Sequence, residues 1–323
     1  MSVVRLFATR AMLLFSLLLA AGQAHALDEL VVGRSVATAM TFTPLEMGEQ
    51  TGLWKQNGLT LKVISFNGDA QLQQALTAGT VQIGLGSGPA LAFIAKGVPV
   101  KAVGAFGGRP YNLCMVIGAG SGIKSIEGLK GKRIGVTSLG SLTHWLVLET
   151  SRRYGWKGSD ALVPVPLGST RAQIAALSRN QISAHVTTVE QGFTHEMNGS
   201  GRIVLNYGDL LKDFITHTFF ARDDLIASRP DTVRRFVLGW QQTIVYMKAH
   251  KDESVKLAAA TLDLKPEIVA RSYPYVMATL SNDPSFDGRA LAVLARSFVE
   301  LGILPKEPDM SQLYTNRFVP GAH

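Results

Sequence analysis

Short apolar runs alternate with helical segments along this chain, and this alternation constrains the fold more than any other feature of the sequence. Apolar runs at residues 30–33, 59–66 and 81–85 are each followed by a helix start signal, and a fourth run covers residues 98–105. Repeated β-loop-α units with short connections build a mostly parallel sheet with helices on its faces and right-handed crossovers.

A second set of such units begins near residue 112. Its apolar runs cover residues 113–117, 133–137, 162–166 and 182–186, with helical segments between them, and an extended apolar stretch at 216–222 indicates a return to the first set. Ligands of open α/β sheets bind outside the carboxyl ends of the strands. We therefore predict an α/β protein with two lobes that face each other across a cleft.

The last hundred residues carry helical periodicity and no strand signal. Apolar residues recur at helical spacing in 230–250, and further helices fit 254–261, 266–279 and 287–301. We interpret these segments as a helical coat on the first lobe. The predicted divisions are a signal peptide at 1–26, lobe one at 27–111 and 219–323, and lobe two at 112–218.

The first 26 residues have the pattern of a secretory signal peptide. Arg5 and Arg10 precede an apolar run over 11–21 that is too short to span a bilayer, and Ala24-His25-Ala26 is a small-x-small cleavage site. Because no cysteine follows the run, we expect no lipid anchor. The mature protein is therefore expected to be free in the periplasm.

Charge and cysteine content limit the possible partners. Cleavage removes two arginines and leaves 30 basic and 24 acidic residues, a formal charge of +6 that either attracts anions or is merely solvated. No dense Lys/Arg run interleaved with aromatic residues is present, so a nucleic-acid partner is not expected. The single cysteine, Cys114, lies in an apolar run and is expected to be a buried structural thiol.

Three phrases, taken in order, carry a family resemblance: EQTGLWKQNGL at 49–59, ALTAGTVQIG at 75–84 and SIEGLKGKRIGV at 125–136. With these phrases the chain resembles the periplasmic solute-binding proteins of ABC importers of the nitrate/sulfonate/taurine type, which are related to the NMT1/THI5-like thiamine-precursor proteins. The family often has a Gly-x-Val-Asp-Ala phrase before a late strand of the second lobe, and here Ser183 stands where the Asp would be.

The resemblance implies a type II periplasmic binding protein fold, a hinged "Venus flytrap" that performs no catalysis and needs no cofactor. It implies a small-molecule ligand, with an ABC permease and an ATPase as partners, and we expect a monomer. The expected ligand is a small organic anion such as an alkanesulfonate, taurine, nitrate or a carboxylate. The alternative is a pyrimidine-type heterocycle, either bound or acted on by an enzyme of the same fold.

Candidate ligand-binding residues cluster where strands lead into helices. Three predicted capping boxes begin at Thr43, Thr170 and Thr188, and free N–H groups at helix starts bind anions. Hydroxyl residues at these turns either donate to a ligand or only cap their own helices. The candidates are Met40, Thr41, Phe42, Asn67, Ser87, Phe106, Ser138, Ser141, His144, Thr170, Arg171 and Thr188, where Met40, Phe42 and Phe106 form an apolar wall unless they belong to the core.

Other site classes are less well supported. The phrase GLGSG at 84–88 lacks the full Gly-x-Gly-x-x-Gly form of a dinucleotide site. His185, Glu190 and His195 are spaced five residues apart, which does not place them on one helix face, so no metal site is expected. No nucleophile-and-base constellation stands out, and we therefore predict a protein that is not an enzyme.

Overall fold

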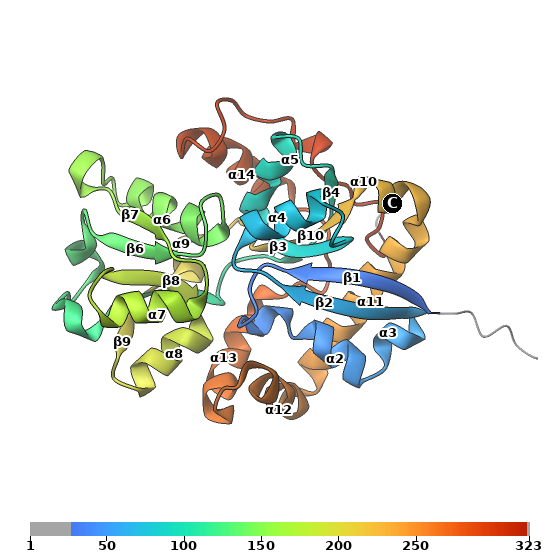
Figure 1. The fold of residues 1–323 in the computed structure, drawn as a ribbon, viewed down its shortest axis with the longest axis horizontal. Coiled ribbons are helices and arrows are strands. Elements are labelled where there is room, and N and C mark those ends of the chain that lie inside the picture. The colour runs from blue at the N-terminus through green and yellow to red at the C-terminus, as the bar shows by residue number, and fades with distance from the viewer. Residues whose placement is uncertain (1–26, 322–323) are drawn as a thin grey trace, which may run out of the picture.

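The computed structural model describes residues 27–321, so the predicted signal peptide at 1–26 lies outside the described residues. Two sheets lie side by side, one in each lobe, as Figure 1 shows. The predicted two-lobed α/β fold is therefore confirmed. The prediction of a mostly parallel sheet is wrong, because two of the four strand pairings in each sheet are antiparallel.

The first sheet, on the right of Figure 1, is built from both early and late parts of the chain. Its order is β2 (Leu59–Ser65), β1 (Asp28–Arg34), β3 (Ile83–Ser87), β10 (His217–Arg222) and β4 (Val100–Gly107). β1 runs parallel to β2 and β3, whereas β10 is antiparallel to both β3 and β4. The late apolar stretch therefore completes the sheet between two strands that precede it by more than a hundred residues.

The second sheet has a related arrangement. Its order is β7 (Val163–Pro166), β6 (Arg133–Val136), β8 (Ala184–Thr188), β5 (Leu113–Gly118) and β9 (Gly201–Asn206). β6 is parallel to β7 and β8, and β5 is antiparallel to β8 and β9. β9 is an edge strand that the sequence analysis did not predict. Its residues are only partly buried, so they carry no strong apolar signal.

Helices follow most strands and cover the sheets. In the first lobe they are α2 (Pro44–Gln50), α3 (Leu53–Gln56), α4 (Asp69–Thr77) and α5 (Leu91–Ala95); in the second they are α6 (Leu142–Arg153), α7 (Thr170–Ser178), α8 (Val189–Met197) and α9 (Tyr207–Leu210). The C-terminal part contains α10 (Asp223–Ser228), α11 (Pro230–Ala249), α12 (Lys251–Leu262), α13 (Pro266–Thr279) and α14 (Gly288–Glu300).

α11 illustrates how the sequence positions a helix. Its Pro230 stands at the first helical position, and its predicted apolar stripe is buried, including Phe236 and Trp240. Trp54 of α3 stacks on Phe236 with ring centroids 5.4 Å apart. The buried stripe therefore attaches α11 to the first lobe.

The C-terminal helices also contact the second lobe. Arg271 of α13 pairs with Glu196 of α8 at 2.8 Å, and its guanidinium lies 3.8 Å from the ring centroid of Phe193. On the other side of the molecule, Trp145 Nε1 of α6 donates to Ser297 Oγ of α14 at 2.9 Å. The two lobes are thus joined by helix contacts as well as by the two segments of chain that cross between them.

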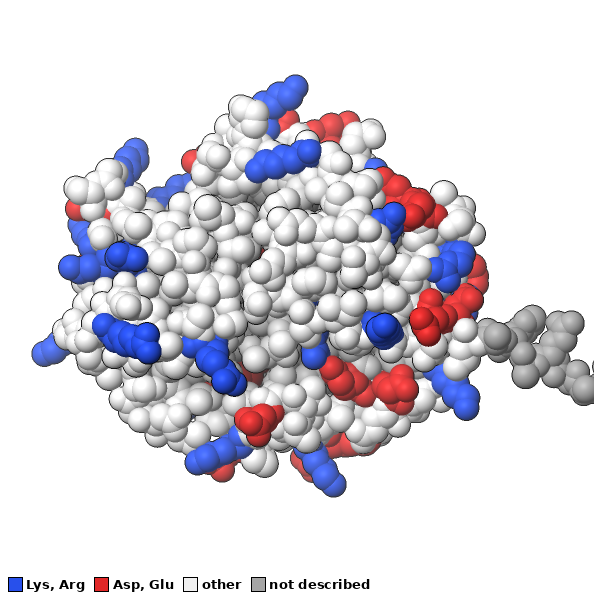
Figure 2. Space-filling view, in the orientation of Figure 1, with Lys and Arg blue, Asp and Glu red and all other residues white. Residues whose placement is uncertain are grey.

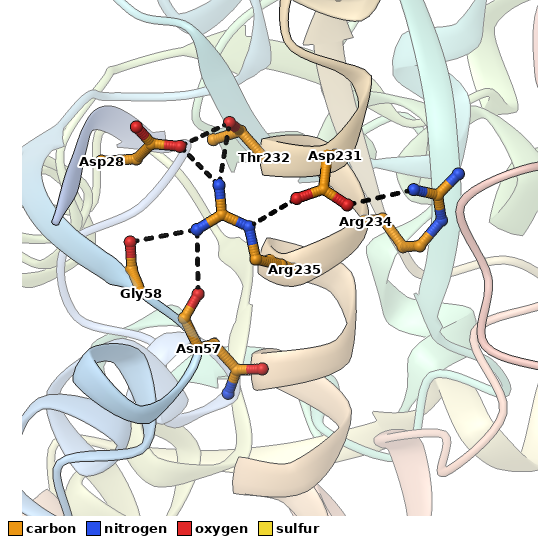
Figure 3. Close-up of polar contacts among 7 residues, drawn as sticks. All are labelled: Asp28, Asn57, Gly58, Asp231, Thr232, Arg234 and Arg235. Atoms are coloured by element: carbon orange, nitrogen blue, oxygen red, sulfur yellow. Dashed lines mark hydrogen bonds and ion pairs between the residues drawn. The ribbon is translucent and has the colours of Figure 1, made fainter. Parts of the chain in front are cut away.

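Arg235 of α11 ties the start of the first sheet together, as Figure 3 shows. Its Nη1 donates to the carbonyl oxygens of Asn57 and Gly58, both at 3.1 Å, and its Nη2 donates to the Asp28 carboxylate. Its Nε donates to Asp231 at 2.9 Å. One guanidinium therefore links β1, the turn before β2 and α11 to one another.

The turn after β3 packs directly against the returning chain. A Cβ atom on Gly88 would overlap the carbonyl oxygen of Ile215, so only glycine fits here without a backbone shift.

Cys114 is fully buried, as predicted, and burial raises its thiol pKa. Within residues 27–321, no helix combines the length and apolarity needed to cross a membrane.

Candidate ligand site between the lobes

A cavity of about 230 Å³ lies where the lobes meet. The first lobe contributes Val36, Ala37, Thr38, Phe66 and Asn67, and the second contributes Thr137, Gly168, Ser169, Thr170 and Arg171. These residues directly follow the ends of β1, β2, β6 and β7. The cavity therefore lies outside the carboxyl ends of parallel strands, where open α/β sheets bind ligands.

The start of α7 supplies the polar wall of this cavity. Ser169, not Thr170, caps the helix by accepting from Ala172 N at 3.3 Å, so the capping box predicted at Thr170 is wrong by one residue. Thr170 Oγ1 instead lies 3.1 Å from Thr38 Oγ1 of the other lobe. Arg171 is exposed at the cavity, where its guanidinium can reach an anion.

A second polar cluster comes from the segments after β1 and β8. Met40 N donates to Glu190 Oε1 at 2.7 Å across the lobes. Among the described residues, the buried atoms Glu190 Oε2, Thr41 Oγ1 and Thr188 Oγ1 have no hydrogen-bond partner. Burial raises the pKa of Glu190 to about 7, so its carboxyl group both donates and accepts near neutral pH.

The other two predicted capping boxes are also wrong. Thr43 and Thr188 precede α2 and α8, but within residues 27–321 neither side chain caps its helix. Thr43 Oγ1 donates to Met40 O at 2.8 Å, because its own backbone is already helical. The Thr188 hydroxyl is therefore not occupied in capping α8.

Two predicted wall residues belong to the core beneath this cluster. Phe42 and Phe106 are almost fully buried, and both contact the His217 ring, at centroid distances of 5.2 and 5.4 Å. Phe106 also stacks on Phe219 at 4.4 Å. Burial lowers the pKa of His217 to about 4, so this imidazole is neutral at neutral pH.

A third group surrounds Asp69, the first residue of α4. Its carboxylate accepts from Ser87 N at 3.0 Å and from Ser87 Oγ at 2.8 Å. It also accepts from Leu142 N of the second lobe at 3.2 Å. Burial raises the pKa of Asp69, against the opposing effect of these hydrogen bonds.

The remaining candidates lie near the start of α6. Ser141 caps the helix by accepting from His144 N at 3.3 Å, so this hydroxyl has a structural partner. His144 Nδ1 accepts from Gly140 N at 3.2 Å, and burial lowers the pKa of His144. Ser138 Oγ is buried next to Gly68 and lacks a hydrogen-bond partner in the part of the chain that the structure describes.

The predicted residues thus divide by location. Asn67, Thr170 and Arg171 line the cavity, and Met40, Thr41 and Thr188 form the second cluster with Glu190. Sequence reasoning did not identify Thr38 and Ser169 at the cavity, or the interlobe hydrogen bonds of Asp69 and Glu190. One sequence signal could have indicated Glu190: it stands two residues after Thr188, the last residue of β8, and therefore lies at the carboxyl end of a strand.

Charge and metal-binding potential limit the chemistry of the site. On the face shown in Figure 2, the charged side chains of the left-hand lobe are mostly Lys and Arg, whereas the right-hand lobe shows both acidic and basic side chains. In the described range 27–321, no group of three His, Cys, Asp or Glu residues could hold a metal ion. The site therefore offers hydroxyls, helix-start N–H groups, carboxyls and one exposed guanidinium.

Comparisons with known proteins agree with this architecture. The chain is 26% identical over 287 residues to a putative binding protein of Brucella abortus, covering 83% of this chain and 84% of that protein. It is 24% identical over 296 residues to a 4-amino-5-hydroxymethyl-2-methylpyrimidine phosphate synthase of Saccharomyces cerevisiae, covering 85% and 83%. The alkanesulfonate-binding protein of Xanthomonas axonopodis pv. citri, solved with MOPS, shares the fold with a TM-score of 0.76 and 21% identity, covering 89% and 98%.

The family comparison covers more than half of the chain. The family described as NMT1/THI5 like matches residues 39–254, which include most of the first sheet, the whole second sheet and α11. The chain therefore belongs to the NMT1/THI5-like family and has the two-lobed fold of periplasmic binding proteins.

Proposed function

We propose that this protein is the periplasmic solute-binding component of an ABC importer, a monomer that captures one small molecule between its lobes. The observation that carries the proposal is the convergence of polar side chains from both lobes on one cavity, at the carboxyl ends of both sets of parallel strands. Its cavity of about 230 Å³ suits a ligand smaller than a drug-sized molecule.

Hinge closure is the proposed mechanism. The chain passes between the lobes after β4 and again before β10, so the short segments at 108–112 and 211–216 are the proposed hinge. A ligand that contacts Thr38 on one lobe and Thr170 on the other gains its full set of contacts only when the lobes are closed. Binding then shifts the population toward the closed form, which the permease would recognise.

An organic anion is the first candidate ligand. α7 begins at the cavity, so its N-terminal N–H groups carry partial positive charge there. Arg171 adds a full charge with bidentate geometry, and Asn67 and Thr170 add uncharged donors. A sulfonate, carboxylate or nitrate would satisfy these groups.

A heterocycle with N–H donors is the second candidate. It is favoured by Glu190, whose buried Oε2 has no hydrogen-bond partner among the described residues and is suited to accept from an amino or ring N–H group. The yeast relatives named as pyrimidine phosphate synthases support the same chemistry and also keep an enzymatic role open as the rival function.

The test is a thermal-shift screen followed by calorimetric titration of the mature protein. The panel contains alkanesulfonates, taurine, nitrate and carboxylates in one arm, and aminopyrimidines in the other. A true ligand at 100 times its Kd adds about 2.7 kcal/mol of stability. Mass spectrometry of each mixture separates binding from turnover, because a binding protein returns its ligand unchanged.

Matched variants assign the ligand to a subsite. Arg171→Gln is expected to weaken an anion at least tenfold, and Glu190→Gln to weaken a heterocycle similarly. Arg179→Gln, at the exposed far end of α7, is the control and should leave affinity unchanged. A panel without any stabilising compound, or a ligand that is insensitive to both cleft variants, would contradict the proposal.

A further inference from the structure

Two buried carboxylates form hydrogen bonds across the interlobe surface in opposite directions. Asp69 of the first lobe accepts from Leu142 N of the second at 3.2 Å. Glu190 of the second lobe accepts from Met40 N of the first at 2.7 Å. Each lobe therefore supplies one carboxylate and one backbone donor to the other.

Contacts within the first lobe orient the Asp69 carboxylate toward the second lobe. Two bonds from Ser87, to its backbone N and its hydroxyl, both lie within the first lobe. The third bond goes to the first residue of α6, a helix of 12 residues. Because Ser141 accepts from His144 N, the side-chain cap of α6 leaves the Leu142 N–H to Asp69. A carboxylate is favoured at this end of a helix by the helix dipole.

The Glu190 bond is shielded from water. Glu190 is the second residue of α8, and only 1% of its surface is exposed. Met40 is fully buried on the opposite side. In such surroundings a charge-assisted or strong neutral hydrogen bond is not exchanged for water while the lobes stay together.

Close packing between the lobes accompanies these bonds, because the backbone of a glycine on one lobe lies against a side chain of the other lobe at two points. Gly68 has a φ of +109°, and a Cβ there would lie 2.5 Å from Ser138 Oγ of the other lobe. Gly140 has a φ of +77°, and a Cβ there would lie 3.0 Å from Cζ of Phe93. At these points the lobes touch each other directly, with no room for a ligand between them.

We propose that Asp69 and Glu190 are interlobe latches, which stabilise the closed arrangement of the lobes in addition to any contact that a solute makes. The inference rests on hinge closure in the proposed function, but on no particular solute. Opening exchanges each latch bond for bonds to water, so each latch shifts the closed-to-open ratio by about tenfold and does not lock it.

Asp69→Asn is the direct test of the first latch. The Asn carbonyl oxygen keeps the bond from Ser87 N, and its amide can donate to Ser87 Oγ, so the contacts within the first lobe survive. The amide N–H, however, then faces the Leu142 N–H, and the interlobe bond is lost. Glu190→Ala removes the second latch independently, and the double variant combines both losses.

The readout is the distance between lobes in solute-free protein. Exposed Lys62 of β2 and Arg179 at the end of α7 are replaced by cysteine for spin or fluorescent labels, and the native Cys114 is buried and remains unlabelled. We expect a measurable population at the short, closed distance in the otherwise unchanged protein. Each latch variant should lower the closed-to-open ratio about tenfold, and the double variant should lower it further.

Glu149→Gln is the matched control. Glu149 is another buried carboxylate, but it pairs with Arg152 and Arg153 of its own helix, so its loss should leave the distance unchanged. Near-ultraviolet circular dichroism verifies folding, and Glu190→Ala carries the test if Asp69→Asn does not fold. A solute-free protein without any closed population, or latch variants with the distance distribution of the control, would overturn the proposal.

The outcome is independent of the ligand screen. Solute-free distances test the latches even if no compound in the panel binds. When a solute is known, the apparent Kd of Asp69→Asn should rise by the factor by which its closed fraction falls. An unchanged Kd combined with an open Asp69→Asn would show that closure and binding are not coupled, which contradicts the hinge mechanism but not the latches.

Discussion

His185 makes the stability of this protein sensitive to acid. The residue lies on β8 with no exposed surface, and within residues 27–321 neither ring nitrogen has a hydrogen-bond partner. Its ring meets the edge of the His195 ring at a centroid distance of 5.1 Å. Burial, with a smaller contribution from His195, lowers the pKa of His185 from 6.5 to about 3. The folded protein therefore keeps a neutral imidazole throughout the mildly acidic range.

The sign and size of the effect follow from proton linkage. Below pH 6.5 the unfolded chain binds a proton at this residue and the folded protein does not, so the free energy of unfolding falls as the pH falls. The loss due to His185 is about 2 kcal/mol at pH 5 and about 3 kcal/mol at pH 4, relative to pH 7.5. Because the group is fully buried, solvent screening reduces these values little.

Urea unfolding of the starting protein and of His185→Leu measures this term. The variant should differ little at pH 7.5, because leucine has a similar volume and leaves no polar atom unpaired, and it should be about 2 kcal/mol less destabilised at pH 5. Glu190, with its raised pKa, gains stability as the pH falls from about 7, but it does so equally in both proteins. Equal losses of unfolding free energy in the two proteins would refute the reasoning.

Three further changes test the packing described above. Arg235→Ala removes the bonds to three chain segments and should cost about 2 kcal/mol of unfolding free energy, whereas the exposed Arg234→Ala should stay within about 0.5 kcal/mol; urea denaturation of both decides. Gly88→Ala should lower the Tm by several degrees through backbone displacement, whereas Gly108→Ala, which meets no described atom within 4 Å, should not. Ser297→Ala leaves the buried indole N–H between α6 and α14 without its partner and should cost about 1–2 kcal/mol by the same denaturation assay.

The sequence predicted elements well wherever burial was strong and local. The apolar runs at 81–85 and 113–117 became the fully buried strands β3 and β5, and the stripe in 230–250 became α11. Helix caps were predicted less well, because Ser169 and Thr170 are equally good capping residues and only the backbone geometry at each position chooses between them.

The polar centre of the cleft could not be predicted from local patterns. Asp69 and Leu142 are 73 positions apart, and Met40 and Glu190 are 150 apart. Such pairs meet only through the relative placement of two lobes, which no periodicity encodes. The sequence could place threonines at strand ends, but not the carboxylates that approach them from the other lobe.

The position of β10 determines the order in which the sheets can be completed during folding. Residues 217–222 insert between β3 and β4, so the first sheet has a gap until this late segment is available. All strands of the second sheet, by contrast, come from residues 113–206. Since contacts between distant segments form slowly, we expect the second sheet to be completed before the first. A chain shortened before residue 217 would retain all strands of the second sheet but lack the strand between β3 and β4.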